Sequence, residues 1–580
     1  MLLELEIDEN LKQELKKNLK NKTIAEILSK DHREISVAEF FEKNRHLLGF
    51  DNPRKALLTT VKEAVDNSLD ACEDARILPE IKVDIIDMGK SRYRVIIEDN
   101  GPGIIKKNVP LVFGKLLYGS KFHKLKQSRG QQGIGISAAV LYSQLTTGRP
   151  VKILSKIGKD HKAYYCELKI NTRTNEPEIV KEEERDWFKE HGTRIELDIE
   201  ASYYRGSQSV DEYIKQTAII NPHATIIYTN PLGEQKIYTR VTEQLPKIPK
   251  EIKPHPYGVE LGLLIKMLNY TKEKNIKKFL IKEFSRVSEK VANEILLKSS
   301  IPPEKNPKEI TREEAERLIN AIKNTKIMVP SSDCLSPIGE ELLEKGLKKE
   351  INAEFYAVSS RSPSVYRGYP FIIEVGLAYG GLLKPDEPAI ILRFANRIPL
   401  LYQSGSCAFT KTVIAMDWKK YGLNQPKGSL PIAPLLILIH IASVWVPYTS
   451  ESKEAIASYP EIMREVKLAL QDVGRKLLKY LSKKKRVKEE LKRRSDIEKY
   501  IPHISLALNQ LLDLDKNIEN ELSERLKAIL ESTRGKIEDI EFDASKNVEY
   551  DEEFAVEQSS LGIVDEIDVV EEDKNESDSK

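Results

Sequence analysis

The spacing of apolar and polar residues predicts a mixture of helices and strands in the first 240 residues. Between Arg54 and Ile77 apolar residues recur at every third or fourth position, which predicts a helix with one apolar face. Short runs of β-branched and aromatic residues predict strands at residues 82–87, 93–98, 151–157, 163–170 and 193–199. Strands interleaved with helices favour a layered α/β domain.

The pattern changes at two breaks in the middle of the chain. Four prolines lie between residues 246 and 256, and residues 257–325 then form a Lys-rich helical pattern without a strand candidate. A second break at 330–337 precedes strand candidates at 371–375 and 389–394. The sequence therefore predicts a small helical region between two regions that contain strands.

Two long segments follow. The most apolar run, residues 430–447, contains Pro434 and His440 and ends at Pro447, so it is shorter than the roughly 20 residues that a membrane-spanning helix needs. Its length and composition predict a buried helix instead. Residues 450–500 have a long, charged, helical pattern. No association with a membrane is expected.

The charge of the chain is unevenly distributed. A chain of 580 residues suggests roughly four domains, and 40% apolar with 31% charged residues excludes a wholly disordered protein. The formal net charge is +2, but residues 541–580 contain 15 acidic and 3 basic residues, which leaves 89 basic and 75 acidic residues elsewhere. The basic body is suited to a polyanionic partner, and the acidic end is predicted to be disordered.

The cysteines give no sign of a metal or disulfide framework. Cys72, Cys166, Cys334 and Cys407 lie far apart and form no CxxC pair, which excludes zinc-ribbon spacing and indicates a reducing, cytosolic compartment. The N-terminal residues have no basic n-region and contain acids within their apolar stretch, so no secretory signal is predicted.

The helix predicted over residues 54–77 is the first segment that carries candidate chemistry. Its polar face has Glu63, Asp66, Asn67, Asp70 and Glu73, which on an arbitrary helix would form a solvated stripe. Glu63 and Asn67, however, are four residues apart and are therefore neighbours on the helix surface. An acid beside an amide oxygen is a suitable pair for a water molecule and a hydrated Mg²⁺, which takes few protein ligands.

Two glycine-containing segments accompany predicted strands. Asp99 follows a strand and precedes Gly101 and Gly103, which allow a sharp turn and a close approach to a ligand. A carboxylate at a strand end can accept a hydrogen bond from an exocyclic amine, although an Asp-Asn-Gly turn is by itself ordinary. Residues 191–193, His-Gly-Thr, precede another strand and carry little information alone.

A third glycine-rich segment, GQQGIGIS, begins at Gly130 and opens an apolar helix. The free N–H groups and the dipole at a helix N-terminus favour phosphate. The segment is not a Walker A loop because GxxxxGK[ST] is absent, and it does not follow a strand as a Rossmann fingerprint must. Alone, it is weak support for a nucleotide site.

The order of these four segments is far more specific than any one of them. Glu…Asn on a helix, then Asp-x-Gly-x-Gly, a Gly-rich lid and Gly-Thr resemble the Bergerat-type ATPases, which include gyrase, a heat-shock chaperone, sensor histidine kinases and the MutL repair proteins. The strings EAVDNSLDAC, FGKLLYGSKFH, SRGQQGIGISAAVLYSQLTTG and QPKGSLPIAP resemble the topoisomerase VI B-subunit family more closely, and the similarity covers roughly residues 36–500.

This resemblance implies an α/β multidomain fold. The expected parts are an N-terminal arm (1–35), a Bergerat-type α/β sandwich ATPase domain (36–240), a small all-α helix–two-turns–helix domain (241–330), an α/β transducer domain with a long C-terminal helix (331–500), C-terminal helices (501–535) and a disordered acidic tail (536–580).

The resemblance also implies a role for each matching residue. Glu63 would be the general base that orients the attacking water, and Asn67 would hold Mg²⁺. Asp99 would recognise the adenine amine, helped by Thr193 through water, and Lys427 would reach the γ-phosphate from the transducer. Further ATP-binding residues would be Gly101, Gly103, Ser120, Lys121, Gly130, Gln131, Gln132, Gly133, Ile134, Gly135, Ile136 and Ser137.

The function implied is that of the ATP-hydrolysing subunit of a type IIB DNA topoisomerase. ATP and Mg²⁺ would drive homodimerisation, which captures double-stranded DNA. A separate topoisomerase VI A subunit would make the double-strand break within an A₂B₂ heterotetramer, so that supercoils are relaxed and DNA is decatenated. The expected location is the cytoplasm, at the nucleoid.

Two other classes of protein share the nucleotide fold. A signalling kinase would need a phospho-accepting histidine in a dimerising helix, and the upstream candidates, His32 and His46, lie in no convincing helical hairpin. A chaperone-like or non-enzymatic clamp is the second alternative. Neither class gives a reason for Lys427 or for the helical insert.

Overall fold

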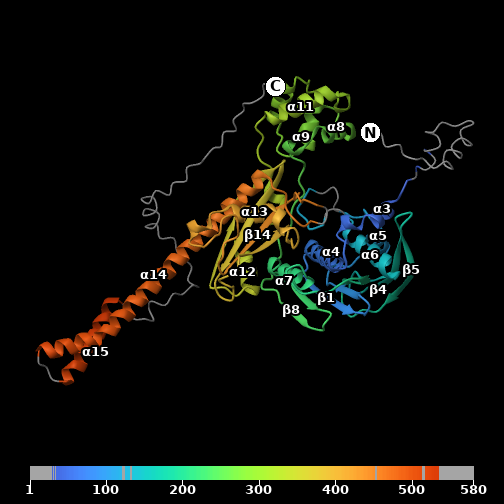
Figure 1. Cartoon of the computed structure of the whole chain (residues 1–580). Coiled ribbons are helices and arrows are strands. Elements are labelled where there is room, and N and C mark those ends of the chain that lie inside the picture. Colours follow the sequence, from blue (N-terminus) through green and yellow to red (C-terminus); the bar gives the residue numbers. More distant parts are fainter. Residues whose placement is uncertain are drawn as a thin grey trace, which may run out of the picture. The chain divides into compact units, whose positions relative to one another are not determined.

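The computed structural model describes residues 29, 32, 34–120, 125–130, 133–450, 453–512 and 516–534 (Figure 1). The chain divides into two compact units, one that ends at Lys479 and one that begins at Tyr480. Most of the predicted N-terminal arm and all of the predicted acidic tail lie outside the described residues.

The first unit contains an eight-stranded sheet. In spatial order its strands are β5 (Glu176–Arg185), β4 (Ala163–Asn171), β3 (Val151–Lys156), β6 (Gly192–Glu200), β2 (Arg92–Glu98), β1 (Glu80–Asp87), β7 (Thr225–Thr229) and β8 (Gln235–Tyr238). Neighbouring strands are antiparallel except β1 and β7, which are parallel. The five strands that the sequence predicts in this region are β1, β2, β3, β4 and β6.

The apolar pattern does not predict β5, β7 or β8. β5 is an edge strand with the sequence EPEIVKEEER, and most of its residues are exposed. An edge strand is exposed and often charged, so no alternation of apolar residues marks it. β7 and β8 have only five and four residues, too few to show a period.

Helices cover the sheet. α4 (Pro53–Asp74), α5 (Val109–Gly114), α6 (Gly135–Thr147) and α7 (Val210–Ile220) pack against it, and α3 (Val37–Lys43) packs on α6. The side chain of Asn52 caps α4 by accepting a hydrogen bond from the N–H of Lys55, and Pro53 is the first helical residue. The polar face of α4 is not a solvated stripe, because Asp66 and Asp70 are buried.

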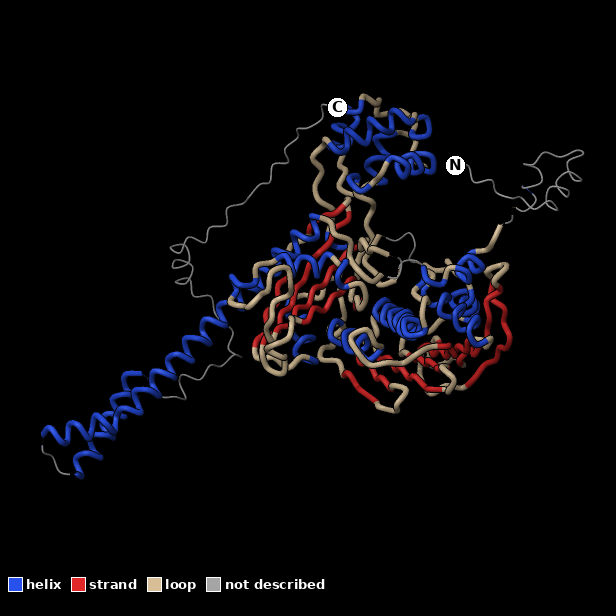
Figure 2. The backbone as a smooth tube through the Cα atoms, in the orientation of Figure 1, coloured by secondary structure: helices blue, strands red, loops and turns tan. Residues whose placement is uncertain are grey.

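The region after the proline cluster is helical, as predicted. It consists of η4 (Pro256–Gly258), α8 (Leu261–Tyr270), α9 (Ile276–Glu283), α10 (Glu289–Ser299), η5 (Pro307–Glu309) and α11 (Arg312–Lys323), with a hydrophobic core of its own. Figure 2 shows this group of helices without a strand among its described residues. Its last helix, α11, begins with a capping box between Thr311 and Glu314.

A second sheet follows within the first unit. Its order is β10 (Ser364–Tyr366), β11 (Tyr369–Tyr379), β14 (Leu435–Ser443), β12 (Ile390–Ala395) and β13 (Ile398–Pro399), with β9 (Phe355–Ser360) paired to β11. β14 runs antiparallel to β11 and parallel to β12. α12 (Glu340–Glu350) packs against this sheet, and α13 (Ala408–Ala415) follows β13.

The predicted buried helix at 430–447 is wrong, because this run contains the central strand β14. All nine residues of β14 are buried, and it pairs with β11 on one side and β12 on the other. A strand buried on both faces has no polar alternation, so periodicity cannot distinguish it from a buried helix. Its repeated isoleucines fit a strand better than a helix.

The long helix predicted at 450–500 is α14 (Pro460–Leu512), which continues into the second unit. The second unit also contains α15 (Lys516–Arg534). Within the described residues, no helix has both the length and the apolar character needed to cross a membrane.

Candidate active site

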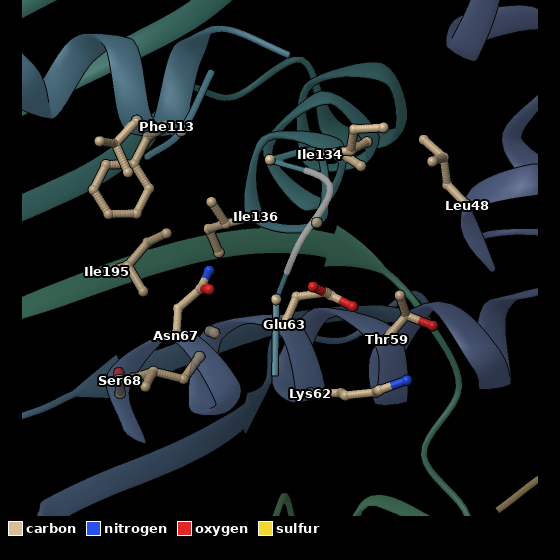
Figure 3. Close-up of a pocket in the computed structure, with 18 of the residues that line it drawn as sticks. Leu48, Thr59, Lys62, Glu63, Asn67, Ser68, Phe113, Ile134, Ile136 and Ile195 are labelled. Atoms are coloured by element: carbon tan, nitrogen blue, oxygen red, sulfur yellow. The ribbon is translucent and has the colours of Figure 1, made fainter. Parts of the chain in front are cut away.

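A cavity of about 1030 Å³ lies beside α4. Residues of α4, β2, β6, α5 and the start of α6 line it, and the loops after β13 and β14 add Tyr402 and Lys453. Figure 3 shows apolar side chains, among them Ile136 and Ile195, on one side of the cavity and polar side chains of α4 on the other. Segments from both sheets therefore build one site.

Glu63 and Asn67 project from α4 into this cavity, one helical turn apart (Figure 3). Within the described residues neither side chain has a hydrogen-bond partner, and Asn67 is exposed. The buried acid between them, Asp66, points elsewhere and accepts a hydrogen bond of 3.0 Å from the hydroxyl of Tyr213. Burial raises the pKa of Asp66 to about 7. One carboxylate and one amide of α4 are thus left for a ligand.

Gly135, the first residue of α6, lies directly against the carboxylate of Glu63. A Cβ on Gly135 would lie 1.8 Å from Oε2 of Glu63, far inside van der Waals contact. The backbone at the start of α6 is therefore in contact with the Glu63 carboxylate, and only a residue without a Cβ allows so close an approach.

Gly135→Ala is expected to displace the Glu63 carboxylate. If Glu63 is the general base that the sequence predicts, kcat for ATP hydrolysis should fall by roughly tenfold, because misplacing a reacting group by about 1 Å is enough for such a loss. The fold should survive, since alanine is favoured over glycine in a helix. Gly262→Ala in α8, where a Cβ meets no atom within 4 Å, is the matched control. Steady-state ATPase assays and thermal melts of both variants test this, and an unchanged kcat for Gly135→Ala would contradict it.

Asp99, directly after β2, also lines the cavity. Its Oδ1 accepts hydrogen bonds from the N–H groups of Gly101 (2.9 Å) and Thr193 (3.1 Å), and its Oδ2 accepts one from the hydroxyl of Ser68 (2.8 Å). Burial raises the pKa of Asp99, and these three donors oppose that shift. The carboxylate is fixed in position and keeps acceptor capacity for an amine in the cavity.

Two glycines near Asp99 serve backbone packing. Gly192 has φ +145°, and a Cβ there would lie 2.3 Å from the carbonyl oxygen of Asp99. Gly103 has φ +72°, and its Cβ would lie 2.1 Å from the carbonyl oxygen of Lys156. Both glycines are needed because β-carbons would separate the segments that hold Asp99.

Two family models match the chain. The one described as "Histidine kinase-, DNA gyrase B-, and HSP90-like ATPase" matches residues 52–201, and the one described as "Topoisomerase VI B subunit, transducer" matches residues 330–493. The B subunit of type 2 DNA topoisomerase 6 from Methanosarcina barkeri is 55% identical over 494 residues, which are 85% of this chain and 80% of that protein. The chain belongs to the topoisomerase VI B-subunit family.

Another member of the topoisomerase VI B-subunit family, from Archaeoglobus fulgidus, is 51% identical over 487 residues, which are 84% of this chain and 81% of that protein. Among solved structures, the B subunit of DNA gyrase from Myxococcus xanthus aligns with 76% of this chain and 95% of its own, but only at TM-score 0.38 and 10% identity. The chain is an ATP-binding subunit of a type II DNA topoisomerase, and most residues of the cavity lie in its ATPase region.

The predicted lid residues are only partly described. Gly130, Gly133, Ile134, Gly135 and Ile136 line the cavity together with Ser120, whereas Lys121, Gln131 and Gln132 lie outside the described residues. Besides Lys427, which is described below, two predicted residues within the described part of the chain are not among those that line the cavity. Gly101 acts through its N–H on Asp99, and Ser137 is buried with its hydroxyl donating to the carbonyl of Ile134 at 2.9 Å.

The structure does not bring Lys427 to the other predicted residues. Lys427 is exposed in a turn before β14 and is not among the residues that line the cavity. The transducer lysine that lines the cavity is Lys453, whose Nζ donates to the carbonyl oxygen of Arg129 at 3.2 Å. Its neighbour Glu454 pairs with Lys55 of α4 at 2.5 Å. No motif in the sequence marks Lys453, and only tertiary contact identifies it.

Sequence reasoning also missed Ser68 and Lys62 on α4. Ser68 donates to Asp99, and a serine one residue after Asn67 is not distinctive in a sequence. Lys62 is partly buried beside Glu63 and Asp66; burial lowers its pKa, and these two acids oppose the shift. A lysine directly before the candidate base could have been noticed in the sequence, because a nearby positive charge favours the charged form of a carboxylate.

Asn67 is compatible with the Mg²⁺ that the family implies. Its amide faces the cavity and makes no hydrogen bond within the described residues, and the position of a Cβ on Gly130 lies 3.8 Å from its Oδ1. Mg²⁺ at a nucleotide takes one or two protein oxygens and otherwise keeps water and phosphate oxygens. A single amide oxygen beside the lid is therefore a sufficient protein ligand.

Proposed function

We propose that this chain is the ATP-driven gate of a type IIB DNA topoisomerase. ATP would bring two copies together around a DNA duplex, and hydrolysis would reset the gate after the duplex has passed through a break in a second duplex. The observation that carries the proposal is that Glu63 and Asn67, which have no hydrogen-bond partner within the described residues, line the same cavity as the fixed carboxylate of Asp99.

The residues that line the cavity have distinct tasks. Asp99 accepts a hydrogen bond from the amino group of adenine, and Thr193 supports this contact through water. Glu63 accepts the proton of the attacking water and orients it toward the γ-phosphate. Asn67 holds Mg²⁺, which when bound neutralises phosphate charge. Backbone N–H groups of residues 130–137 wrap the phosphates, as the N-terminus of a helix favours.

We assign the sensing of the γ-phosphate to Lys427. A single cation on a loop of the transducer can report whether the γ-phosphate is present and so couple hydrolysis to domain motion. Lys427 is exposed and away from the cavity in this structure, so its arrival at the nucleotide would accompany a movement of the transducer.

We propose that DNA cleavage is carried out by a separate A subunit. The relatives are named as B subunits of a type 2 topoisomerase, and an A₂B₂ heterotetramer follows from one gate of two B subunits. Substrates would be supercoiled and catenated double-stranded DNA. Work on chromosomal DNA would place the enzyme in the cytoplasm at the nucleoid.

Relaxation of supercoiled plasmid in gels tests this function. The chain with its A subunit and ATP should relax the plasmid, whereas the chain alone, the A subunit alone, or both without ATP should not. The Glu63→Ala variant with the A subunit is the matched control and should not sustain relaxation. Relaxation by this chain alone, or no relaxation by the complete mixture, would overturn the proposal.

A further inference from the structure

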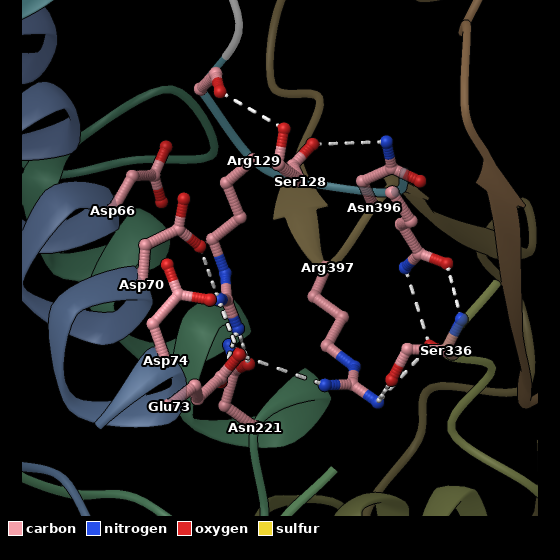
Figure 4. A network of polar contacts seen from close by, with 12 residues as sticks. Asp66, Asp70, Glu73, Asp74, Ser128, Arg129, Asn221, Ser336, Asn396 and Arg397 are labelled. Atoms are coloured by element: carbon pink, nitrogen blue, oxygen red, sulfur yellow. Dashed lines mark hydrogen bonds and ion pairs between the residues drawn. The ribbon is translucent and has the colours of Figure 1, made fainter. Parts of the chain in front are cut away.

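The residues just before the lid are held in a buried polar network (Figure 4). We call residues 125–129 the lid root. We propose that Arg129 of the lid root is a positioning residue for ATP hydrolysis: it ties the lid both to α4 and to the transducer, so that the position of the transducer sets the position of the lid. This inference rests on the ATPase function proposed above.

Arg129 binds α4 through two carboxylates. Its Nη1 donates to Oδ1 of Asp70 and to Oε2 of Glu73, both at 2.8 Å, and its Nη2 donates to Oε1 of Glu73 at 2.7 Å. Nη2 also donates to the amide oxygen of Asn221 at 2.6 Å. The Arg129 side chain is only 3% exposed. Separating this buried, bidentate ion pair would leave uncompensated charges in the interior of the protein. The lid root therefore stays attached to α4 as long as the pair is intact.

This attachment fixes the lid relative to the catalytic face of α4. Asp70 lies about one helical turn after Asn67, and Glu73 about one turn further. The residue that follows Arg129 is Gly130. A Cβ on Gly130 would lie 3.8 Å from the amide oxygen of Asn67, so the two residues are close neighbours. The Arg129 bonds therefore determine where the first lid residue meets Asn67.

The transducer holds the same lid root from the opposite side. The amide of Asn396 donates to the carbonyl oxygen of Ser128 at 3.1 Å and to that of Ser443 on β14 at 2.9 Å. Gln127 and Ser336 exchange two hydrogen bonds, from Nε2 to the Ser336 carbonyl (3.2 Å) and from the Ser336 N–H to Oε1 (2.7 Å). The lid root is thus attached to the central strand of the transducer sheet.

The transducer contact comes from a tight turn between β12 and β13. Asn396 and Arg397 have φ of +47° and +65°, a left-handed pair in which Asn-Gly is the usual sequence. Arg397 is nevertheless present at the second position, and its guanidinium is buried, with Nη2 donating to the carbonyls of Ser336 and Pro337, both at 3.2 Å. Its Nη1 lies 3.9 Å from Oε2 of Glu73.

Glu73 is therefore shared by an arginine of the lid root and an arginine of the transducer (Figure 4). Burial acts to raise the pKa of Glu73, but the Arg129 charge and hydrogen bonds from His223 and Arg129 hold it well below its usual range. The carboxylate stays charged in the network. A movement of Arg397 changes the electrostatic potential at Glu73 and therefore the strength of the Arg129–Glu73 ion pair. This shared carboxylate connects the transducer to the lid.

Asn396→Ala is the first test, because it removes the link to Ser128 and leaves the Arg129–Glu73 pair in place. In the full chain we expect kcat for ATP hydrolysis to fall roughly tenfold, as for a misplaced catalytic geometry, while KM for ATP changes less than about threefold. Arg129→Gln should lower kcat further. The double variant should be no slower than Arg129→Gln, because both changes release the same lid root.

Arg94→Gln is the matched control for the loss of an arginine–carboxylate pair. Arg94 of β2 pairs with Asp198 in the same ATPase region, and neither residue lines the cavity. It should lower Tm and leave kcat unchanged when all variants are assayed well below the lowest Tm.

Three outcomes would overturn the inference: an unchanged kcat in Asn396→Ala, effects of Asn396→Ala and Arg129→Gln that multiply, or the same loss of kcat in Arg94→Gln. Failure of the unsubstituted chain to hydrolyse ATP would instead refute the proposed function.

Discussion

Replacing Glu63 by alanine is expected to lower kcat for ATP hydrolysis by about 10²–10⁴-fold, the range associated with a positioned general base. ATP binding and ATP-dependent dimerisation should persist, because the role proposed for the Glu63 carboxylate is toward the attacking water, whereas adenine recognition is assigned to a different residue of the cavity, Asp99. Single-turnover hydrolysis, measured beside equilibrium binding of a non-hydrolysable ATP analogue, separates the two effects.

The control for Glu63→Ala is Glu243→Ala, which removes an exposed carboxylate far along the chain. It should hydrolyse ATP at the unsubstituted rate. Glu63→Gln keeps the volume of the side chain beside Gly135 but cannot accept a proton, so it should be nearly as slow as Glu63→Ala. Normal turnover in Glu63→Gln would remove Glu63 from the role of base.

Replacing Asp99 by asparagine is expected to weaken ATP binding by about 10²-fold, because a hydrogen bond to a charged acceptor contributes about 1.5–3 kcal/mol. Asparagine retains the shape and can still accept from the Gly101 and Thr193 N–H groups, so the turn should stay folded. Its NH₂ group, however, cannot accept from the adenine amine. Calorimetric titration with a non-hydrolysable ATP analogue measures the loss.

Asp198→Asn is the control for Asp99→Asn, since Asp198 is a largely buried acid of β6 that pairs with Arg94 and Arg149 and does not line the cavity. Its ATP affinity should be unchanged. Burial raises the pKa of Asp99, so acidification should protonate it, and weaken ATP binding, at a pH where an ordinary aspartate is still charged. Equal affinity in Asp99→Asn and the unsubstituted chain would refute adenine recognition by Asp99.

Local spacing explains why much of the site was predictable. Glu63 and Asn67 face the same way because a helix returns to the same face after four residues, whatever surrounds it. Asp99 lies at the end of a strand because the apolar run before it has the length of one. Gly135 opens α6 as the glycine-rich segment predicts. These features depend on a few consecutive residues.

The strand β14, in contrast, could not be predicted. It is buried on both faces and therefore lacks the alternation of polar and apolar residues that identifies a strand. The run at 430–447 is apolar without alternation, and only its pairing with β11 and β12 makes it a strand. The charged edge strand β5 is the opposite case, because solvent on its surface permits polar residues at almost every position.

The sequence by itself determined the family, the order of the ATPase segments and the face of α4 that carries Glu63 and Asn67. Only the tertiary structure decided that Lys453 reaches the cavity while Lys427 does not, and that Arg129 shares Glu73 with Arg397. The physical reason is distance along the chain. Partners hundreds of residues apart meet through the packing of whole sheets and helices, which no local pattern encodes.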